Sequence, residues 1–198
     1  PELIELWRDD RLCRHFHLAL QSGSDTVLRS MNRRYSIDDY VNTIRSINQL
    51  VPGVAITTDI IVGFPGESDE EFEQSYRFCK QIGFANIHVF PFSPRPGTQA
   101  VELPNQVKDE VKKERTQRML KLAQECRERF YAQFVGYILP ILWEGKTAHG
   151  SGICSGLTDN YIRVFAESST SLINEIGSVR LAGFHNPGMW GLANENSS

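Results

Sequence analysis

The sequence predicts an α/β fold: a partial parallel (β/α) barrel of about three βα units followed by a small all-β barrel. Apolar strand-like runs alternate with helix-like segments over the first two thirds of the chain. After Gly136, short alternating runs broken by glycines replace the helical periodicity. The 198 residues, 40% apolar and 23% charged, are typical of a globular protein, and no run of about 18 apolar residues predicts a membrane span.

The βα units follow from the order of the elements. Three strands are expected, at Phe16–Gln21, Val54–Val62 and Asn86–Phe92. Helices are expected from the SGSD stretch through Leu50 with a break near Arg33–Ser36, over Ser68–Ile82 behind a capping-box pattern, and over Val107–Phe134 behind the SPRPGTQA loop. Strands joined by crossover helices pair in parallel, through right-handed connections.

The second part of the chain predicts a separate domain. Its strands are expected at Tyr137–Trp143, Tyr161–Ala166 and Ile176–Ala182. We therefore divide the chain into residues 1–135, residues 136–193 and a disordered tail over 194–198. Because the chain starts at Pro1 instead of methionine, further sequence upstream is expected.

One face of the three parallel strands carries polar side chains. Side chains of a strand alternate between its faces, so Gln21, Asp59 and His88 fall on the face opposite the apolar residues. Ligands of parallel sheets bind at the carboxyl ends of the strands, which favours a polar ligand near Gln21 and Asp59. Structural roles for these two residues, in a turn or a hydrogen-bond network, are the alternatives.

The sequence pattern predicts neither a metal site nor a phosphate-binding loop. His15 and His17 share one strand face, but no third ligand has a useful spacing. The GFPGE stretch that follows the second strand lacks the Lys-Ser/Thr of a phosphate-binding loop. The four cysteines form no closely spaced pair, which fits a reducing, cytoplasmic compartment.

Charge is unevenly distributed. The net charge of −3 argues against a generally basic nucleic-acid binder. Residues 107–134 nevertheless hold eight bases against five acids, whereas the part after Gly136 holds three bases against five acids. A polyanionic partner would therefore find most of its positive charge on the long helix.

Three motifs, in this order and spacing, resemble the second half of the radical S-adenosylmethionine domain of the methylthiotransferases: HFHLALQSGSDTVLRSMNRRYS, TTDIIVGFPGESDEEF and HVFPFSPRPGTQA. The part from Gly136 resembles the TRAM domain of that family. The stretch RLCRHFHLALQSGSD is most similar to the branch that modifies threonylcarbamoyladenosine beside the tRNA anticodon. Branches that act on isopentenyladenosine or on a ribosomal-protein aspartate are the alternatives.

The resemblance implies a cofactor, a partner and their residues. Gln21, Arg33 and Asp59 are the implied S-adenosylmethionine contacts, with Arg34 as the rival of Arg33. The implied partner is the tRNA anticodon stem-loop, with contacts expected at Ser93, Arg95, Lys146 and Arg163. The reaction implied for the parent enzyme adds a methylthio group to carbon 2 of adenosine.

The chain departs from the family in its cysteines. No CxxxCxxC spacing is present to hold a [4Fe-4S] cluster, and ligands for a second cluster are likewise missing. We expect a parent enzyme whose N-terminal half supplies these ligands, and a chain that has no catalytic residue and is inactive alone. A non-catalytic RNA-binding module is the alternative, and the oligomeric state is left open.

Overall fold

The structure is a computed structural model that describes residues 2–146, 152–168 and 172–193, apart from the side chains of Lys146 and Ala193. The tail at 194–198, predicted to be disordered, lies outside these residues. The chain forms two compact units. One, the sheet unit, consists of Phe16–Gln49 and Ile56–Arg127; the other, the barrel unit, consists of Pro1–His15, Leu50–Ala55 and Glu128–Ser198.

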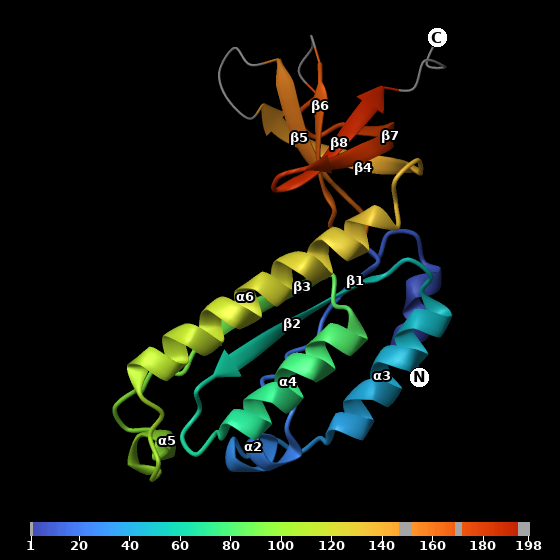
Figure 1. Cartoon of the computed structure of the whole chain (residues 1–198). Helices are drawn as coiled ribbons and strands as arrows, with labels where there is room; N and C mark the ends of the chain where they lie inside the picture. The colour runs from blue at the N-terminus through green and yellow to red at the C-terminus, as the bar shows by residue number, and fades with distance from the viewer. Residues whose placement is uncertain (1, 147–151, 169–171, 194–198) are drawn as a thin grey trace. The chain divides into compact units, whose positions relative to one another are not determined.

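A three-stranded sheet in the order β1-β2-β3 forms the centre of the sheet unit (Figure 1). Its strands are β1 (His15–His17), β2 (Ala55–Val62) and β3 (Asn86–Pro91). β2 and β3 are parallel, with Thr57 opposite Asn86 and Val62 opposite Pro91. An isolated parallel bridge between Gln21 and Ile60 continues the pairing beyond the short β1. The predicted parallel pairing is thus confirmed.

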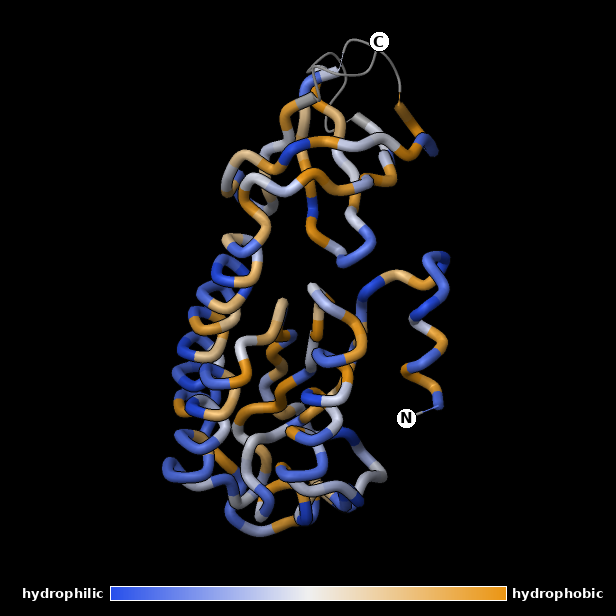
Figure 2. The backbone as a smooth tube through the Cα atoms, turned by 90° about the vertical axis from the view of Figure 1, so that its right-hand side faces the viewer, coloured by the Kyte–Doolittle hydropathy of each residue, from blue (hydrophilic) through white to orange (hydrophobic). Residues whose placement is uncertain are grey.

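The predicted helices are present, and the long segment before Leu50 is split as expected. They are α2 (Asp25–Ser30), α3 (Ile37–Leu50), α4 (Asp69–Ile82) and α6 (Asp109–Ala132). The capping box at the start of α4 is complete, because the Ser68 and Glu71 side chains each accept a hydrogen bond from the other's backbone N–H. Hydrophilic and hydrophobic residues alternate along α6 (Figure 2), as expected for a helix with one buried stripe.

Apolar side chains on one face of the sheet are enclosed by these helices. Ile60 and Val62 of β2 are 0% and 1% exposed, and Phe72 of α4 is 1% exposed. Tyr40 of α3 donates a hydrogen bond to the Leu18 carbonyl oxygen at 2.6 Å, which satisfies its hydroxyl inside the core. The opposite face of the sheet is therefore the one left for a ligand.

The second unit contains a closed barrel of five strands in the order β4-β5-β6-β8-β7 (Figure 1). β6 and β8 are parallel, and the other neighbouring pairs are antiparallel. They are β4 (Ile138–Lys146), β5 (Ile153–Thr158), β6 (Arg163–Glu167), β7 (Ile176–His185) and β8 (Gly188–Ala193). The predicted all-β barrel is confirmed, but the predicted strands omitted β5 and β8. Both contain glycines and few β-branched residues, so their sequences lack a strand signature. Short helices α1 (Glu2–Glu5), η1 (Leu6–Arg8) and α5 (Gln99–Glu102) were also not predicted.

The turn between β5 and β6 contacts the N-terminal segments of the same unit. Arg14 donates hydrogen bonds to both carboxylate oxygens of Asp159, at 2.5 and 2.9 Å. The side-chain amide of Asn160, which is fully buried, donates to the Gly53 carbonyl oxygen at 3.0 Å. These contacts explain why the barrel unit includes residues from the beginning of the chain.

Over the residues the structure describes, no helix has the length and apolarity to cross a membrane.

Candidate functional site

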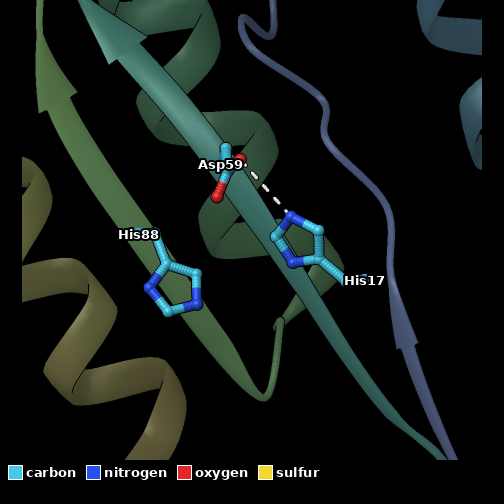
Figure 3. Close-up of side chains that lie close together, drawn as sticks. All are labelled: His17, Asp59 and His88. Carbon is cyan, nitrogen blue, oxygen red and sulfur yellow. Dashed lines mark ion pairs between the residues drawn. The ribbon is translucent and has the colours of Figure 1, made fainter.

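Three polar side chains from three neighbouring strands lie together on the sheet face opposite the buried core (Figure 3). They are His17 of β1, Asp59 of β2 and His88 of β3, and Asp59 and His88 are direct partners in the strand register. His17 Nε2 lies 3.3 Å from Asp59 Oδ2, with side chains 42% and 28% exposed. The alternation of the strand sequences therefore predicted correctly that Asp59 and His88 share a face.

Gln21 lies where the chain leaves β1. Its backbone φ is +68°, in the left-handed region that residues other than glycine rarely adopt. Its N–H donates to the Asp59 carbonyl oxygen at 2.8 Å, and its carbonyl oxygen accepts from the Ile61 N–H at 2.9 Å. The residue is 7% exposed. A costly backbone conformation held in place by two strand hydrogen bonds is a frequent feature of functional sites.

The loop after Gln21 is fixed to α4. The Gly23 N–H donates to Ser75 Oγ at 2.9 Å, and the hydroxyls of Ser22 and Ser75 are 3.1 Å apart. A Cβ on Gly23 would lie 2.6 Å from the Ser75 Cα, so only glycine allows this approach. The SGS sequence thereby holds the position of Gln21.

The GFPGE turn after β2 contains an ion pair that sequence reasoning missed. Gly63 and Gly66 have φ values of +73° and +82°, as their place in the turn predicted. Glu67, which is 4% exposed, accepts hydrogen bonds from the Gly63 N–H and from Arg115 of α6, both at 2.6 Å. Burial raises the pKa of the Glu67 carboxyl, against the opposing effect of these two donors.

The remaining predicted residues of the sheet unit are more exposed. Arg33 lies between α2 and α3, and among the described residues it has no ion-pair partner. Arg95 lies in the exposed loop before α5. Ser93 lines a pocket of about 480 Å³ between the end of β3 and α6, which also contains Lys113 and the ion pair of Lys112 with Asp109. The structure thus places Gln21 beside Asp59 and gives Ser93 a pocket, but shows no contact from Arg33 to either Gln21 or Asp59.

The predicted RNA contacts of the barrel unit are Lys146 and Arg163. The side chain of Lys146 lies outside the described part of the chain. Arg163 of β6 has a side chain that is 33% exposed and forms an ion pair with Glu144 of β4, across the intervening β5. Its positive charge is therefore partly neutralised by the protein itself.

Within the described residues, no cysteine belongs to the cluster of His17, Asp59 and His88. Cys79 and Cys126 are buried between α4 and α6, Cys154 is buried in the barrel, and Cys13 is exposed. Burial raises the pKa of the Cys79 thiol well above its usual range. Within the described residues, no cysteine belongs to a group of three potential ligands, so these residues do not fit an iron–sulfur cluster.

Comparison with known proteins shows which families the chain resembles. The Radical SAM superfamily profile matches residues 1–79. The threonylcarbamoyladenosine tRNA methylthiotransferase of Bacillus subtilis is 37% identical over 91% of this chain and 41% of its own length. The tRNA-2-methylthio-N(6)-dimethylallyladenosine synthase of Syntrophotalea carbinolica is 39% identical, also over 91% of this chain and 41% of its own length. This chain is a relative of the tRNA methylthiotransferases.

The similarity covers most of this chain but less than half of each methylthiotransferase. The synthase of Caldicellulosiruptor saccharolyticus is 45% identical over 73% of this chain, but over only 31% of its own length. The chain thus spans about two fifths or less of the methylthiotransferases compared here. Among solved structures, an archaeal Elp3 from Methanocaldococcus infernus is 13% identical, with a TM-score of 0.45 over 91% of this chain and 59% of its own.

Proposed function

We propose that this chain is the cofactor-facing and RNA-facing part of a tRNA methylthiotransferase of the cytoplasm. The reaction adds a methylthio group to carbon 2 of a modified adenosine beside the anticodon, and threonylcarbamoyladenosine is the favoured nucleoside. The identity to methylthiotransferases over nine tenths of the chain carries the proposal. The polar face of the parallel strands supports it, because Asp59 and His88, midway along β2 and β3, offer hydrogen-bonding groups to a polar ligand.

S-adenosylmethionine fits the residues of this face. The carboxylate of Asp59 and the carboxamide of Gln21 are hydrogen-bonding groups on adjacent segments, suited to the ribose hydroxyls. Arg33 is the candidate for the methionine carboxylate, since a guanidinium binds a carboxylate through two parallel hydrogen bonds. When bound, the cofactor and its cluster supply the radical chemistry that activates the adenine ring. Because the cysteines of this chain do not fit the cluster, we assign its ligands to the parent protein, and this chain is inactive alone.

The closed barrel is proposed as a TRAM domain that contacts the anticodon stem-loop of tRNA. Ser93 and Arg95 of the sheet unit, and Lys146 and Arg163 of the barrel unit, are the proposed contacts. Arginine and lysine neutralise phosphates, which gives RNA binding its dependence on salt. The pocket at Ser93 adds Lys113 to the same set, whereas its Lys112 is paired with Asp109.

The Asp59 carboxylate tests the cofactor assignment. In the complete protein, Asp59→Asn is expected to weaken S-adenosylmethionine binding at least about tenfold, because one charge-assisted hydrogen bond contributes about 1.5 to 3 kcal/mol. Iron content should not change, because Asp59 is not a cluster ligand. Asp9→Asn is the matched control, since Asp9 is an acid of the barrel unit that is paired with Arg11. Equal cofactor affinities for the two variants would remove the assignment.

A further inference from the structure

The three side chains on the polar face form a set of metal donors. One carboxylate and two imidazoles, from Asp59, His17 and His88, have ligand atoms that all lie within 4.8 Å of one another. Two histidines and one carboxylate are a common protein donor set for zinc and for other divalent transition metals. The sequence alone did not reveal this set, because its members are about 30 to 40 residues apart along the chain.

The spacing of the closest pair matches a shared ion. Zinc bonds to histidine nitrogen and carboxylate oxygen of about 2.1 Å, at a tetrahedral angle, place two ligand atoms about 3.4 Å apart. His17 Nε2 and Asp59 Oδ2 are 3.3 Å apart. Both atoms can therefore reach one ion without moving the strands. The third ligand needs only a side-chain rotation, since His88 is exposed.

A neighbouring hydroxyl orients the His17 ring. His17 Nδ1 lies 3.0 Å from Thr57 Oγ1, while Nε2 faces Asp59. When Nδ1–H donates to Thr57, Nε2 presents its lone pair toward a carboxylate, and a cation between them stabilises both groups. Histidine ligands of metals are commonly fixed by a hydrogen bond at the second ring nitrogen. Thr57 occupies that position here.

The strands hold the donors in fixed positions. Asp59 and His88 are cross-strand partners on the parallel β2 and β3. The rings of His17 and His88 are tilted by 58° with centroids 5.9 Å apart, so they do not stack on each other. Both histidines are exposed, so packing in the core does not explain their presence on this face. A water molecule can reach the open side of the ion and serve as its fourth ligand.

We propose that His17, Asp59 and His88 form a binding site for one divalent transition-metal ion of the zinc class. The site goes beyond the proposed function and shares one residue with it. Because Asp59 cannot bind the ion and a ribose at the same time, zinc and S-adenosylmethionine should exclude each other if both assignments hold.

Titration of the 198-residue chain with zinc chloride, followed by calorimetry, tests the site. The measurements use a Cys13→Ser background, because Cys13 is the exposed thiol among the described residues. We expect one zinc ion per chain, and an affinity lowered at least about tenfold by His17→Ala and by His88→Ala. With cobalt(II) as the probe, the visible bands of a low-symmetry site should appear in the parent chain and be lost in both variants.

His185→Ala is the matched control, because it removes a histidine of the barrel unit whose ring packs edge-on against Phe165 and tilted against Trp190. It should leave zinc affinity unchanged. Both test positions are exposed, and circular dichroism with thermal melting confirms that each variant is folded. Zinc affinity that stays the same in both His17→Ala and His88→Ala overturns the proposal.

Measuring zinc affinity and S-adenosylmethionine affinity in the same variants tests the metal site and the cofactor assignment separately. His17→Ala and His88→Ala should lower zinc affinity and leave S-adenosylmethionine affinity within about twofold in the complete protein. Asp59→Asn should lower both. If Asp59→Asn lowers zinc affinity alone, the metal site stands and the cofactor assignment fails; if it lowers cofactor affinity alone, the reverse holds.

Discussion

Glu67 and Arg115 form a buried ion pair, with Glu67 Oε2 2.6 Å from Arg115 Nη1 and side chains 1% and 5% exposed. The pair joins the GFPGE turn, which follows the proposed cofactor strand, to the long helix α6. The two partners differ in their other contacts. Arg115 also reaches the exposed Asp69 at 2.7 Å, whereas Glu67 has the Gly63 N–H as its further donor. Removing one partner should therefore differ from removing the other.

Arg115→Met should lower the free energy of unfolding by about 3 to 5 kcal/mol, because it leaves a buried carboxylate without its counter-ion. Glu67→Gln should cost less than half of that, since Arg115 keeps Asp69 as a partner and no charge is left unpaired. The double variant should recover most of the loss caused by Arg115→Met. Urea denaturation of the three variants measures these differences, and equal losses in the two single variants would contradict the asymmetry.

The pKa of Glu67 determines how the free energy of unfolding should change with pH. Burial raises the pKa of Glu67 above its ordinary 4.5, so the folded chain binds this proton more readily than the unfolded chain. The contribution of this group to stability therefore increases as pH falls through the window between the raised value and 4.5, and decreases as pH rises. In Arg115→Met the pKa should be raised further, because the lowering effect of the arginine is lost.

Comparing the parent chain with Arg115→Met across pH checks that expectation. The deficit of the variant should shrink as pH decreases from about 7 toward about 5, because protonation removes the unpaired charge. The Glu67→Gln background is the control, since it has no proton to gain at this site. A deficit that is independent of pH in Arg115→Met would show that Glu67 is not the titrating group.

Substitutions at Gln21 separate backbone strain from cofactor binding, because Gln21→Gly and Gln21→Ala should differ in stability but lose the same side-chain amide. A residue other than glycine in the left-handed region costs roughly 1 to 2 kcal/mol, so Gln21→Gly relieves strain that Gln21→Ala keeps. Both variants lose the carboxamide proposed to contact the cofactor. We expect Gln21→Gly to be about 1 kcal/mol more stable than Gln21→Ala, after the entropy that glycine adds to the unfolded chain.

S-adenosylmethionine binding of the two Gln21 variants supplies the second half of that test. Both should bind the cofactor more weakly than the parent protein, to a similar extent, because each lacks the same amide. If Gln21→Ala retained full affinity, the amide would have no role. If Gln21→Gly were less stable than Gln21→Ala, the left-handed backbone at this position would be without strain.

The parallel sheet was predictable because local patterns determine it. Alternation along the second strand placed Asp59 opposite the apolar residues, and a capping box marked the start of α4. The pair of Glu67 and Arg115 was not predictable, because no local rule joins residues 48 positions apart. The same reason hid His88 as the neighbour of Asp59 and His17, since only the strand register brings them together. Strand β5 was missed because its packing comes from neighbouring strands instead of from β-branched residues.

Gly23 should tolerate no side chain. In Gly23→Ala the added Cβ would lie 2.6 Å from the Ser75 Cα and 3.1 Å from the Phe78 Cβ, so the loop or α4 must shift. We expect a loss of about 2 kcal/mol or more in the free energy of unfolding, from overpacking and from the weakened hydrogen bond to Ser75. Gly66→Ala is a useful comparison, because a Cβ there meets no atom within 4 Å and only backbone strain applies. A smaller loss in Gly23→Ala than in Gly66→Ala would contradict the close approach.

Arg163 forms an ion pair with Glu144, which limits the positive charge available for the proposed contact with RNA. If Arg163 contacts a phosphate, Glu144→Gln should raise tRNA affinity, because it frees the guanidinium from a competing carboxylate. Arg163→Ala should lower the affinity and reduce the slope of log affinity against log salt by about 1. Filter binding of unmodified tRNA to the chain over a salt series measures both effects.

Glu175→Gln separates that local effect from a change of net charge. Glu175 is an exposed acid of the same unit, and its neutralisation changes the net charge by the same amount as Glu144→Gln. Long-range attraction would increase equally in both variants, whereas release of Arg163 would increase affinity in Glu144→Gln alone. In the Arg163→Ala background the advantage of Glu144→Gln over Glu175→Gln should disappear, because no guanidinium remains to be released. An advantage that persisted there would mean that tRNA avoids Glu144 directly, and that Arg163 is a structural partner of β4 with no phosphate contact.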